Sequence, residues 1–279
     1  AEFGFMRRAL LGCIAISVGA TPVGTFLMLR RMSLTGDAMA HAILPGAAVG
    51  FLVFGLSLIP MTIGGLTAGL LVALLSGFVT RMTILREDAS LAAFYLISLA
   101  IGVLIVSTRG SNVDLMHVLF GTVLALDDAT LILLCSISSF SLVTLSLLFR
   151  PLVLECADPQ FFRSVSGLSA ITHFTFLLLV VLNLVGGFHA IGTLMAVGVM
   201  ILPATSARFW AISIGGMIAT AVAIAMISSL IGLLLSFYYS LPSGPAIILV
   251  NGIVYGLSVF LGPIGGLLTQ TINQQQLKI

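Results

Sequence analysis

Charged side chains are scarce in this sequence: Asp, Glu, Lys and Arg together make up 7% of its 279 residues. A soluble globular domain has about 25% charged residues, so the composition excludes an ordinary soluble fold. The formal net charge of +2 is too small to indicate a chain that binds nucleic acid. The three cysteines, Cys13, Cys135 and Cys156, are far apart, which argues against a disulfide framework or a thiolate metal cluster.

Motifs for nucleotide binding and for covalent catalysis are missing as well. The sequence has no Gly-x4-Gly-Lys-Ser/Thr loop, and its one lysine is Lys278, so the chain does not cradle nucleotide phosphates in the usual way. The order of residues gives no Ser/His/Asp or Cys/His arrangement for a nucleophile and its base. We therefore predict no catalytic residues and a chain that is not itself an enzyme.

Apolar residues dominate instead, at 59% of the chain with a mean hydropathy of +1.25. A helix needs roughly 20 apolar residues to cross a bilayer. Nine apolar runs are candidates, at about 9–29, 38–56, 60–79, 90–107, 129–149, 169–186, 188–203, 210–238 and 246–268. The run at 188–203 is short and holds Gly192, Gly198 and Pro203, so it fits a partial or broken helix. The sequence thus predicts an all-α polytopic membrane protein, a bundle of eight or nine transmembrane helices.

The whole chain, residues 1–279, is predicted to be a single transmembrane domain, with no repeat, low-complexity linker or second domain. The apolar run after Arg7 and Arg8 continues to about Leu29, which is longer than a signal-peptide core, so we expect it to be the first span. Glycines at a spacing of four let helices approach closely in lipid. Such pairs are Gly46/Gly50, Gly65/Gly69, Gly252/Gly256 and Gly262/Gly266.

Arginines indicate the orientation, because Lys and Arg accumulate in short cytoplasmic loops. Six of them follow the first, third and fifth spans: Arg30, Arg31, Arg81, Arg86, Arg150 and Arg163. Arg7, Arg8 and Arg109 lie on the other side. We therefore expect the 150–168 loop in the cytoplasm and the N-terminus outside.

The longest polar interval is 150–167. Within it Asp158 is a suitable N-cap and Pro159 suits the first helical position, so we expect a short cytoplasmic helix at about 156–167. Its apolar side chains are Phe161, Phe162 and Val165. Two interpretations stay open: an interfacial helix on the lipid headgroups, or a docking knob whose aromatic side chains enter a pocket of a soluble partner.

Asp37 and His41 lie four residues apart in the run Ser33–Gly46, at the start of the second apolar segment. Residues at i and i+4 share one helix face, with β-carbons about 6 Å apart, so a carboxylate oxygen and an imidazole nitrogen can bind one metal ion. Ionisable residues are costly near lipid, and they mark functional sites there. The alternative is structural: Thr35 or Asp37 caps the helix, and His41 bonds to a neighbour.

Other polar side chains are weaker candidates. Asp114 and His117 belong to an outer loop, where they could receive metal or contact a binding protein, although an ordinary exposed polar loop is the favoured explanation. His189 precedes the broken apolar run and could line the route as a secondary metal ligand. His173 and Asn183 lie inside a span, where we expect them to bond to neighbouring helices.

Several segments resemble the motifs of a known family. They are Leu29–Gly46, which contains Asp37 and His41; Leu119-Phe120-Gly121; Asp158-Pro159-Gln160-Phe161-Phe162-Arg163; and Gly192–Arg208, with its Leu-Pro-Ala-Thr-Ser-Ala-Arg ending. In this order, across nearly the whole chain, they resemble the zinc/manganese/iron-type permeases of ABC importers, the ABC-3 family. The family's coupling segment is of the Asp-Pro-Glu-Phe-Ala type, so Gln160 here replaces an acidic residue.

The resemblance implies a multi-pass permease of the bacterial inner membrane, a homodimer of two copies surrounded by membrane lipid. It would receive a divalent metal ion, zinc or manganese or else iron, from an extracytoplasmic binding protein, and it would hold no permanent cofactor. Separate ATP-binding cassette subunits would dock on Asp158–Arg163. Asp37 and His41 of two copies would supply four N and O donors, as zinc accepts, and manganese or iron could use them with added water.

Two other functions stay open on the sequence alone. A secondary transporter driven by protons or ions needs coupling acids within its spans, and only Asp37 qualifies clearly. An intramembrane hydrolase built on Asp37 and His41 lacks a third zinc ligand. Association with an ATPase and a binding protein separates the permease from both alternatives.

Overall fold

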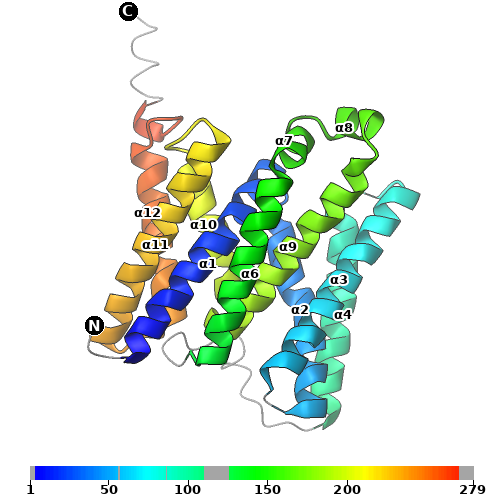
Figure 1. Cartoon of the computed structure of the whole chain (residues 1–279), viewed down its shortest axis with the longest axis horizontal. Coiled ribbons are helices and arrows are strands. Elements are labelled where there is room, and N and C mark those ends of the chain that lie inside the picture. The colour runs from blue at the N-terminus through cyan, green and yellow to red at the C-terminus, as the bar shows by residue number, and fades with distance from the viewer. Residues whose placement is uncertain (1–3, 56, 86, 110–125, 270–279) are drawn as a thin grey trace, which may run out of the picture.

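The computed structural model describes residues 4–55, 57–85, 87–109 and 126–269, and the regular elements in these ranges are α-helices (Figure 1). They are α1 (Gly4–Leu29), α2 (Ser33–Phe54), α3 (Leu58–Met82), α4 (Glu87–Arg109), α6 (Asp128–Leu147), α7 (Phe149–Ala157), α8 (Pro159–Val165), α9 (Leu168–Ile191), α10 (Thr193–Ala207), α11 (Ile214–Tyr239) and α12 (Ser243–Leu261). The predicted all-α fold is confirmed.

Within these ranges eight helices are long and apolar enough to cross a membrane, namely α1, α2, α3, α4, α6, α9, α11 and α12. The remaining apolar helix, α10, has 15 residues. At about 1.5 Å of rise per residue it covers only about 22 Å of a hydrocarbon core roughly 30 Å thick. Within the described ranges, the nine predicted crossings therefore correspond to eight full-length helices and one short helix.

Gly192 separates the short helix from α9. Its φ of 84° lies in the left-handed region, which glycine adopts without strain because it has no β-carbon. α9 therefore ends at Ile191, and α10 begins one residue later at Thr193. The chain reverses here, which brings Ala196 of α10 back against Gly187 of α9.

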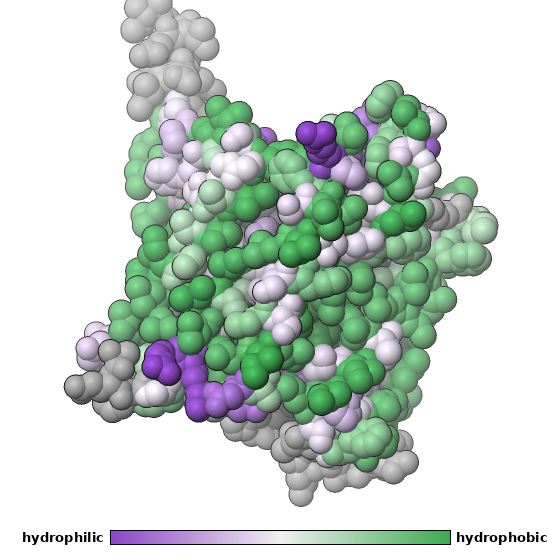
Figure 2. Space-filling model, viewed as in Figure 1, coloured by the Kyte–Doolittle hydropathy of each residue, from purple (hydrophilic) through white to green (hydrophobic). Residues whose placement is uncertain are grey.

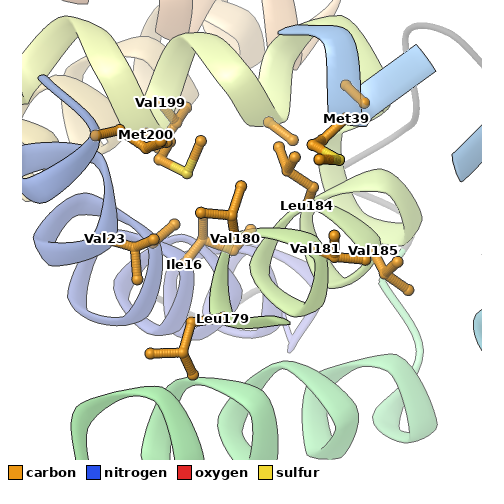
Figure 3. Close-up of a cluster of buried hydrophobic side chains, with 14 of the residues drawn as sticks. Ile16, Val23, Met39, Leu179, Val180, Val181, Leu184, Val185, Val199 and Met200 are labelled. Atoms are coloured by element: carbon orange, nitrogen blue, oxygen red, sulfur yellow. The ribbon is translucent and has the colours of Figure 1, made fainter. Parts of the chain in front are cut away.

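Among the eight long helices, α1 and α9 are the most buried. In their most apolar windows 78% and 61% of residues are buried, against 17% in α4 at the periphery. Figure 3 shows Val180 of α9 between Ile16 of α1 and Met200 of α10, with Leu184 nearer to Met39 of α2. The outer helices expose apolar side chains, and Figure 2 shows a largely hydrophobic face with hydrophilic residues gathered at its two ends. This distribution suits a belt of lipid around the bundle.

The two short helices α7 and α8 lie at the same end of the bundle as the turn between α1 and α2 (Figure 1). The elements at this end carry Arg30, Arg31, Arg150 and Arg163, four of the arginines expected in the cytoplasm. The sequence predicted one short helix in this interval. The second, α7, was not predicted.

Small residues bring α2 and α3 together. A β-carbon added at Gly46 would collide with the backbone carbonyl of Gly64 on α3, and one added at Gly50 would also meet the α3 backbone. A β-carbon at Gly252 or Gly256 of α12 would meet nothing within 4 Å among the described residues. The glycine spacing therefore predicted a close helix contact correctly in α2, whereas in α12 no such contact forms within the described part of the chain.

Polar side chains inside the bundle bond between helices, as predicted for His173 and Asn183. Asn183 Nδ2 of α9 donates to Ser141 Oγ of α6 over 2.7 Å. His173 Nδ1 lies 2.7 Å from an Arg30 guanidinium nitrogen. Hydrogen bonds of this kind hold membrane helices in register where apolar packing alone does not.

The contact between α2 and α3 can be tested with Gly46→Ala. We expect this change to destabilise the protein by about 1–3 kcal/mol, because the added methyl group has to push α2 away from α3. The matched control is Gly252→Ala, which adds the same group to open space on α12 and should change stability by less than about 0.5 kcal/mol. Thermal unfolding of the purified variants in detergent makes the comparison. Equal midpoints would contradict the close contact.

Candidate functional site

The helix α2 places Asp37 and His41 close to the end of the bundle that carries α7 and α8. A short turn follows α1, and α2 begins at Ser33. At about 1.5 Å of rise per residue, Asp37 lies about 6 Å and His41 about 12 Å along α2 from its start. Both residues belong to a helix that is long and apolar enough to span a membrane. The pair therefore lies on this candidate span, in the half of α2 nearer to α7 and α8.

The two side chains face each other. His41 Nε2 lies 3.8 Å from Asp37 Oδ1, and the exposed fractions of the two side chains are 27% and 53%. The His41 ring stacks on Tyr95 of α4, with ring centroids 6.1 Å apart. His41 Nδ1 is buried and has no hydrogen-bond partner among the described residues. The ring is thus held against Tyr95 on one side, while its Nε2 lies beside a carboxylate oxygen of Asp37.

The Asp37 carboxylate does not cap the N-terminal end of α2. Its N-cap is Met32, and no side chain there accepts a hydrogen bond from the first helical turn. Asp37 is the fifth residue of the helix, beyond the reach of a capping group, which bonds to the second or third helical residue. Thr35, the other possible cap, is buried within the helix. The capping interpretation is therefore wrong for both residues.

One copy of the chain supplies only two donors at this position. Among the described residues no group of three or more His, Cys, Asp or Glu side chains converges on a point that could hold a metal ion. Divalent transition metals take four or more ligands. A binding site at Asp37 and His41 thus requires donors from water or from another molecule.

His189 does not join this pair. It lies near the C-terminal end of α9, whereas α9 begins beside α8 at the opposite end of the bundle (Figure 1). His189 Nδ1 lies 2.9 Å from the Val185 carbonyl oxygen, and Nε2 is buried without a partner among the described residues. The other two predicted residues, Asp114 and His117, lie outside the described residues.

The helix α8 begins as predicted. Asp158 is its N-cap, and Asp158 Oδ1 accepts hydrogen bonds from the backbone N–H groups of Gln160 and Phe161 over 3.0 and 2.9 Å. Pro159 occupies the first helical turn, where its missing N–H is not needed. The helix ends at Val165. These local bonds make α8 a defined helix of 7 residues although it is short.

The structure separates the two phenylalanines of α8, which the sequence placed together on one docking face. Phe161 is 57% exposed, and Val165 is exposed beside it, whereas Phe162 is only 5% exposed. Arg163 is also exposed. Phe162 therefore anchors α8 to the bundle, and Phe161 with Val165 forms the surface available to a partner.

A buried cluster of polar groups was missed by sequence reasoning. An Arg30 guanidinium nitrogen lies 3.1 Å from Glu155 Oε1 and 2.7 Å from His173 Nδ1, and the three side chains are at most 7% exposed. Burial raises the pKa of the neighbouring Cys156 thiol to about 11, against the opposing effect of Arg30. The sequence predicted Arg30 in a cytoplasmic loop and gave no bonding partner for it. The available signal was Glu155, an acidic residue three positions before the cap of α8.

A protein-family model described as the ABC 3 transport family matches residues 2–262. The chain therefore belongs to this family, and it is a multi-pass permease of the ABC transporter class in the bacterial cell membrane. Membership of this family favours the permease over the two alternative functions considered from the sequence, a secondary transporter and an intramembrane hydrolase.

Relatives and a solved structure agree with this placement. The manganese import system permease protein ScaB of Streptococcus parasanguinis is 32% identical over 262 residues, which cover 94% of this chain and 92% of ScaB. The chelated iron transport system membrane protein YfeD of Yersinia pestis is 26% identical over 253 residues, 91% of this chain and 84% of YfeD. The structure of PsaBC from Streptococcus pneumoniae in complex with Fab matches with a TM-score of 0.84 at 28% identity, covering 100% of this chain and 96% of that chain.

The two phenylalanines of α8 should differ in their effect on stability. Phe162→Ala removes a buried aromatic ring, and we expect it to destabilise the protein by about 3–5 kcal/mol. Phe161→Ala trims an exposed ring and should change stability by less than about 0.5 kcal/mol. Thermal unfolding in detergent measures both. Similar midpoints for the two variants would show that Phe162 does not anchor α8.

Proposed function

We propose that this chain is the membrane-spanning subunit of an ATP-driven importer for a divalent transition-metal ion, and that the ion passes Asp37 and His41. The observation that carries the proposal is this pair of side chains. A carboxylate and an imidazole lie 3.8 Å apart on one face of a helix that is long and apolar enough to span the membrane. Neither side chain caps the start of this helix. Ionisable groups kept in such a place without a structural role indicate a route for an ion.

The ligand atoms of Asp37 and His41 indicate which metal ions the site would bind. A carboxylate oxygen and an imidazole nitrogen suit manganese, ferrous iron and zinc, whereas a thiolate site would favour softer metals. The relatives named above are manganese and iron transport proteins by their names. We infer manganese as the first ion to test, followed by iron and zinc.

A second copy of the chain completes the site in this proposal. Asp37 is 53% exposed although its helix crosses the membrane, and a carboxylate facing lipid is costly. A two-fold axis beside α2 would bring two Asp37 and two His41 side chains together and would cover the carboxylates. Four N and O donors then surround the ion, which satisfies tetrahedral zinc and leaves room for water on manganese or iron. We therefore infer a homodimer.

The two ends of the bundle would meet different partners. At the end that carries α8, the exposed Phe161 and Val165 would dock on a separate ATPase subunit, because this chain has no phosphate-binding loop. At the opposite end, where α4 finishes and α6 begins, an extracytoplasmic binding protein would deliver the metal (Figure 1). The loop with Asp114 and His117 joins these two helices in the sequence, so we keep it as a candidate contact for that protein.

Asp37→Asn tests the metal route directly. This change keeps the size of the side chain and one oxygen donor but removes the charge that offsets the cation, so we expect metal uptake to fall by at least about tenfold. The matched control is Asp88→Asn, which removes the same charge from an exposed position at the start of α4 and should leave uptake unchanged. Uptake of manganese into cells, corrected for the amount of permease in the membrane, measures both. Wild-type uptake in Asp37→Asn would remove Asp37 from the route.

Phe161→Ala tests the docking of the ATPase. Truncation of an aromatic anchor typically costs about 1–2 kcal/mol or more, so we expect the permease to bind its ATPase roughly tenfold more weakly or worse. The control is Phe140→Ala on α6, which trims a side chain of similar exposure, 49% against 57%, far from α8. Co-purification of the ATPase from detergent at several protein concentrations measures the affinity. Equal retention by both variants would place the ATPase elsewhere.

A further inference from the structure

We infer that Arg30, Glu155 and His173 form a buried unit that carries the movement of α7 and α8 to α2, and thereby positions Asp37 and His41. This inference rests on the proposed function, because it assumes that α8 docks on an ATPase and that the ion passes α2. The three residues do not touch the ion in this view. They are positioning residues for the coupling of ATP hydrolysis to transport.

The unit joins three elements that are distant in the sequence. Arg30 directly follows α1, Glu155 lies on α7 three residues before the cap of α8, and His173 lies in the second turn of α9. Arg30 bonds to both partners through the same guanidinium nitrogen, over 3.1 Å to Glu155 and 2.7 Å to His173. The guanidinium group also lies 4.9 Å from the centre of the Phe176 ring, where a cation is attracted to the aromatic face. The segments on both sides of α8 are thus tied to the end of α1.

A short turn connects Arg30 of this cluster to α2. Only Arg31 and Met32 separate Arg30 from Ser33, the first residue of α2. Arg31 has a φ of 58°, and the Met32 N–H donates to the Leu27 carbonyl oxygen over 2.9 Å. A turn this short cannot absorb a displacement of Arg30 by uncoiling. We therefore expect a shift of Glu155 that keeps its bond to Arg30 to move the first turns of α2, which hold Asp37 and His41.

The charges make the tie difficult to break. Glu155 is 2% exposed and Arg30 is 7% exposed at the side chain, and separating a buried ion pair leaves two desolvated charges without compensation. The easier response is for the three segments to move together. Arg30 Nη1 and Glu155 Oε2 are buried and have no partner among the described residues. They offer a second donor and a second acceptor, which help the two charges stay in contact as the three segments move together.

A second metal stop is a poorer explanation of the same cluster. Glu155 and His173 could in principle bind a cation, and His173 Nδ1 lies 3.7 Å from Glu155 Oε1. The guanidinium group of Arg30 already occupies the space between them and carries a permanent positive charge. A divalent ion at this place would be repelled by Arg30. The three side chains therefore bond to one another and do not bind the transported metal.

The experiment uses the permease with its ATPase and binding protein in sealed vesicles, and it measures metal ions moved per ATP hydrolysed. The main variant is Arg30→Met combined with Glu155→Leu, because replacing both members of a buried ion pair by apolar groups preserves folding better than removing one. We expect the complex to assemble and to hydrolyse ATP, while the metal moved per ATP falls at least fivefold. A wild-type ratio in this variant would overturn the inference and assign the cluster to structure alone.

Two further variants test the charge of Glu155 and control for the net charge at this end of the bundle. Glu155→Gln preserves volume and hydrogen bonding but removes the charge, and we expect the ratio to fall at least twofold; a wild-type ratio here would also overturn the inference. Arg150→Gln removes the same kind of charge as a change of Arg30, from an exposed position on α7 at the same end of the bundle, and should keep the wild-type ratio. An equal fall in Arg150→Gln would show that only the net charge at this end matters, and would likewise overturn the inference. Failure of the proposed function is distinct, since it would show as absent metal uptake by the unaltered complex.

Discussion

Hydrocarbon offers no hydrogen-bond partners, and the organisation of this protein follows from that constraint. Each backbone amide within the membrane has to bond inside its own helix, so the described spans are continuous helices and the breaks have identifiable causes, such as Gly192 between α9 and α10. Several buried polar side chains meet the same requirement by bonding to one another. Asn183 bonds to Ser141 between helices, and Arg30 bonds to Glu155 and His173. Against this background the half-exposed carboxylate of Asp37 stands apart as a polar group that the fold itself does not use.

The proposed docking surface for the ATPase and the proposed metal site lie close together at one end of the bundle. The surface proposed for the ATPase lies on α8, and the Asp37–His41 pair lies within about 12 Å of the start of α2 at the same end of the bundle. A buried ion pair and a turn of two residues, Arg31 and Met32, connect these parts. The interior helices α1 and α9 both take part in the connection, one by its last turn and the other by its first. In the mechanism that we propose, a movement at α8 would reach Asp37 and His41 without a rearrangement of the whole bundle.

Local features of the sequence predicted local features of the structure. Asp158 could be identified as the cap of α8 because a cap bonds to residues two and three positions away, which the sequence itself displays. Adjacent Phe161 and Phe162 could not be told apart in this way. They have the same hydropathy, and only the position of α9 and α7 against α8 decides which ring is buried. The glycine pairs show the same limit, since equal spacing produces a tight contact at Gly46 and none at Gly252 within the described chain.

The sequence by itself determined that this is a polytopic helical membrane protein, that α8 is a capped helix between two spans, and that Asp37 and His41 share one helix face. These properties follow from composition, from the length of apolar runs and from spacings of a few residues, because the bilayer and the helix act on each segment separately. Only the tertiary structure decided that Arg30 is buried with Glu155 and His173, at separations of 125 and 143 positions. Which helices become neighbours depends on the packing of the whole bundle, and no local pattern in the chain records it.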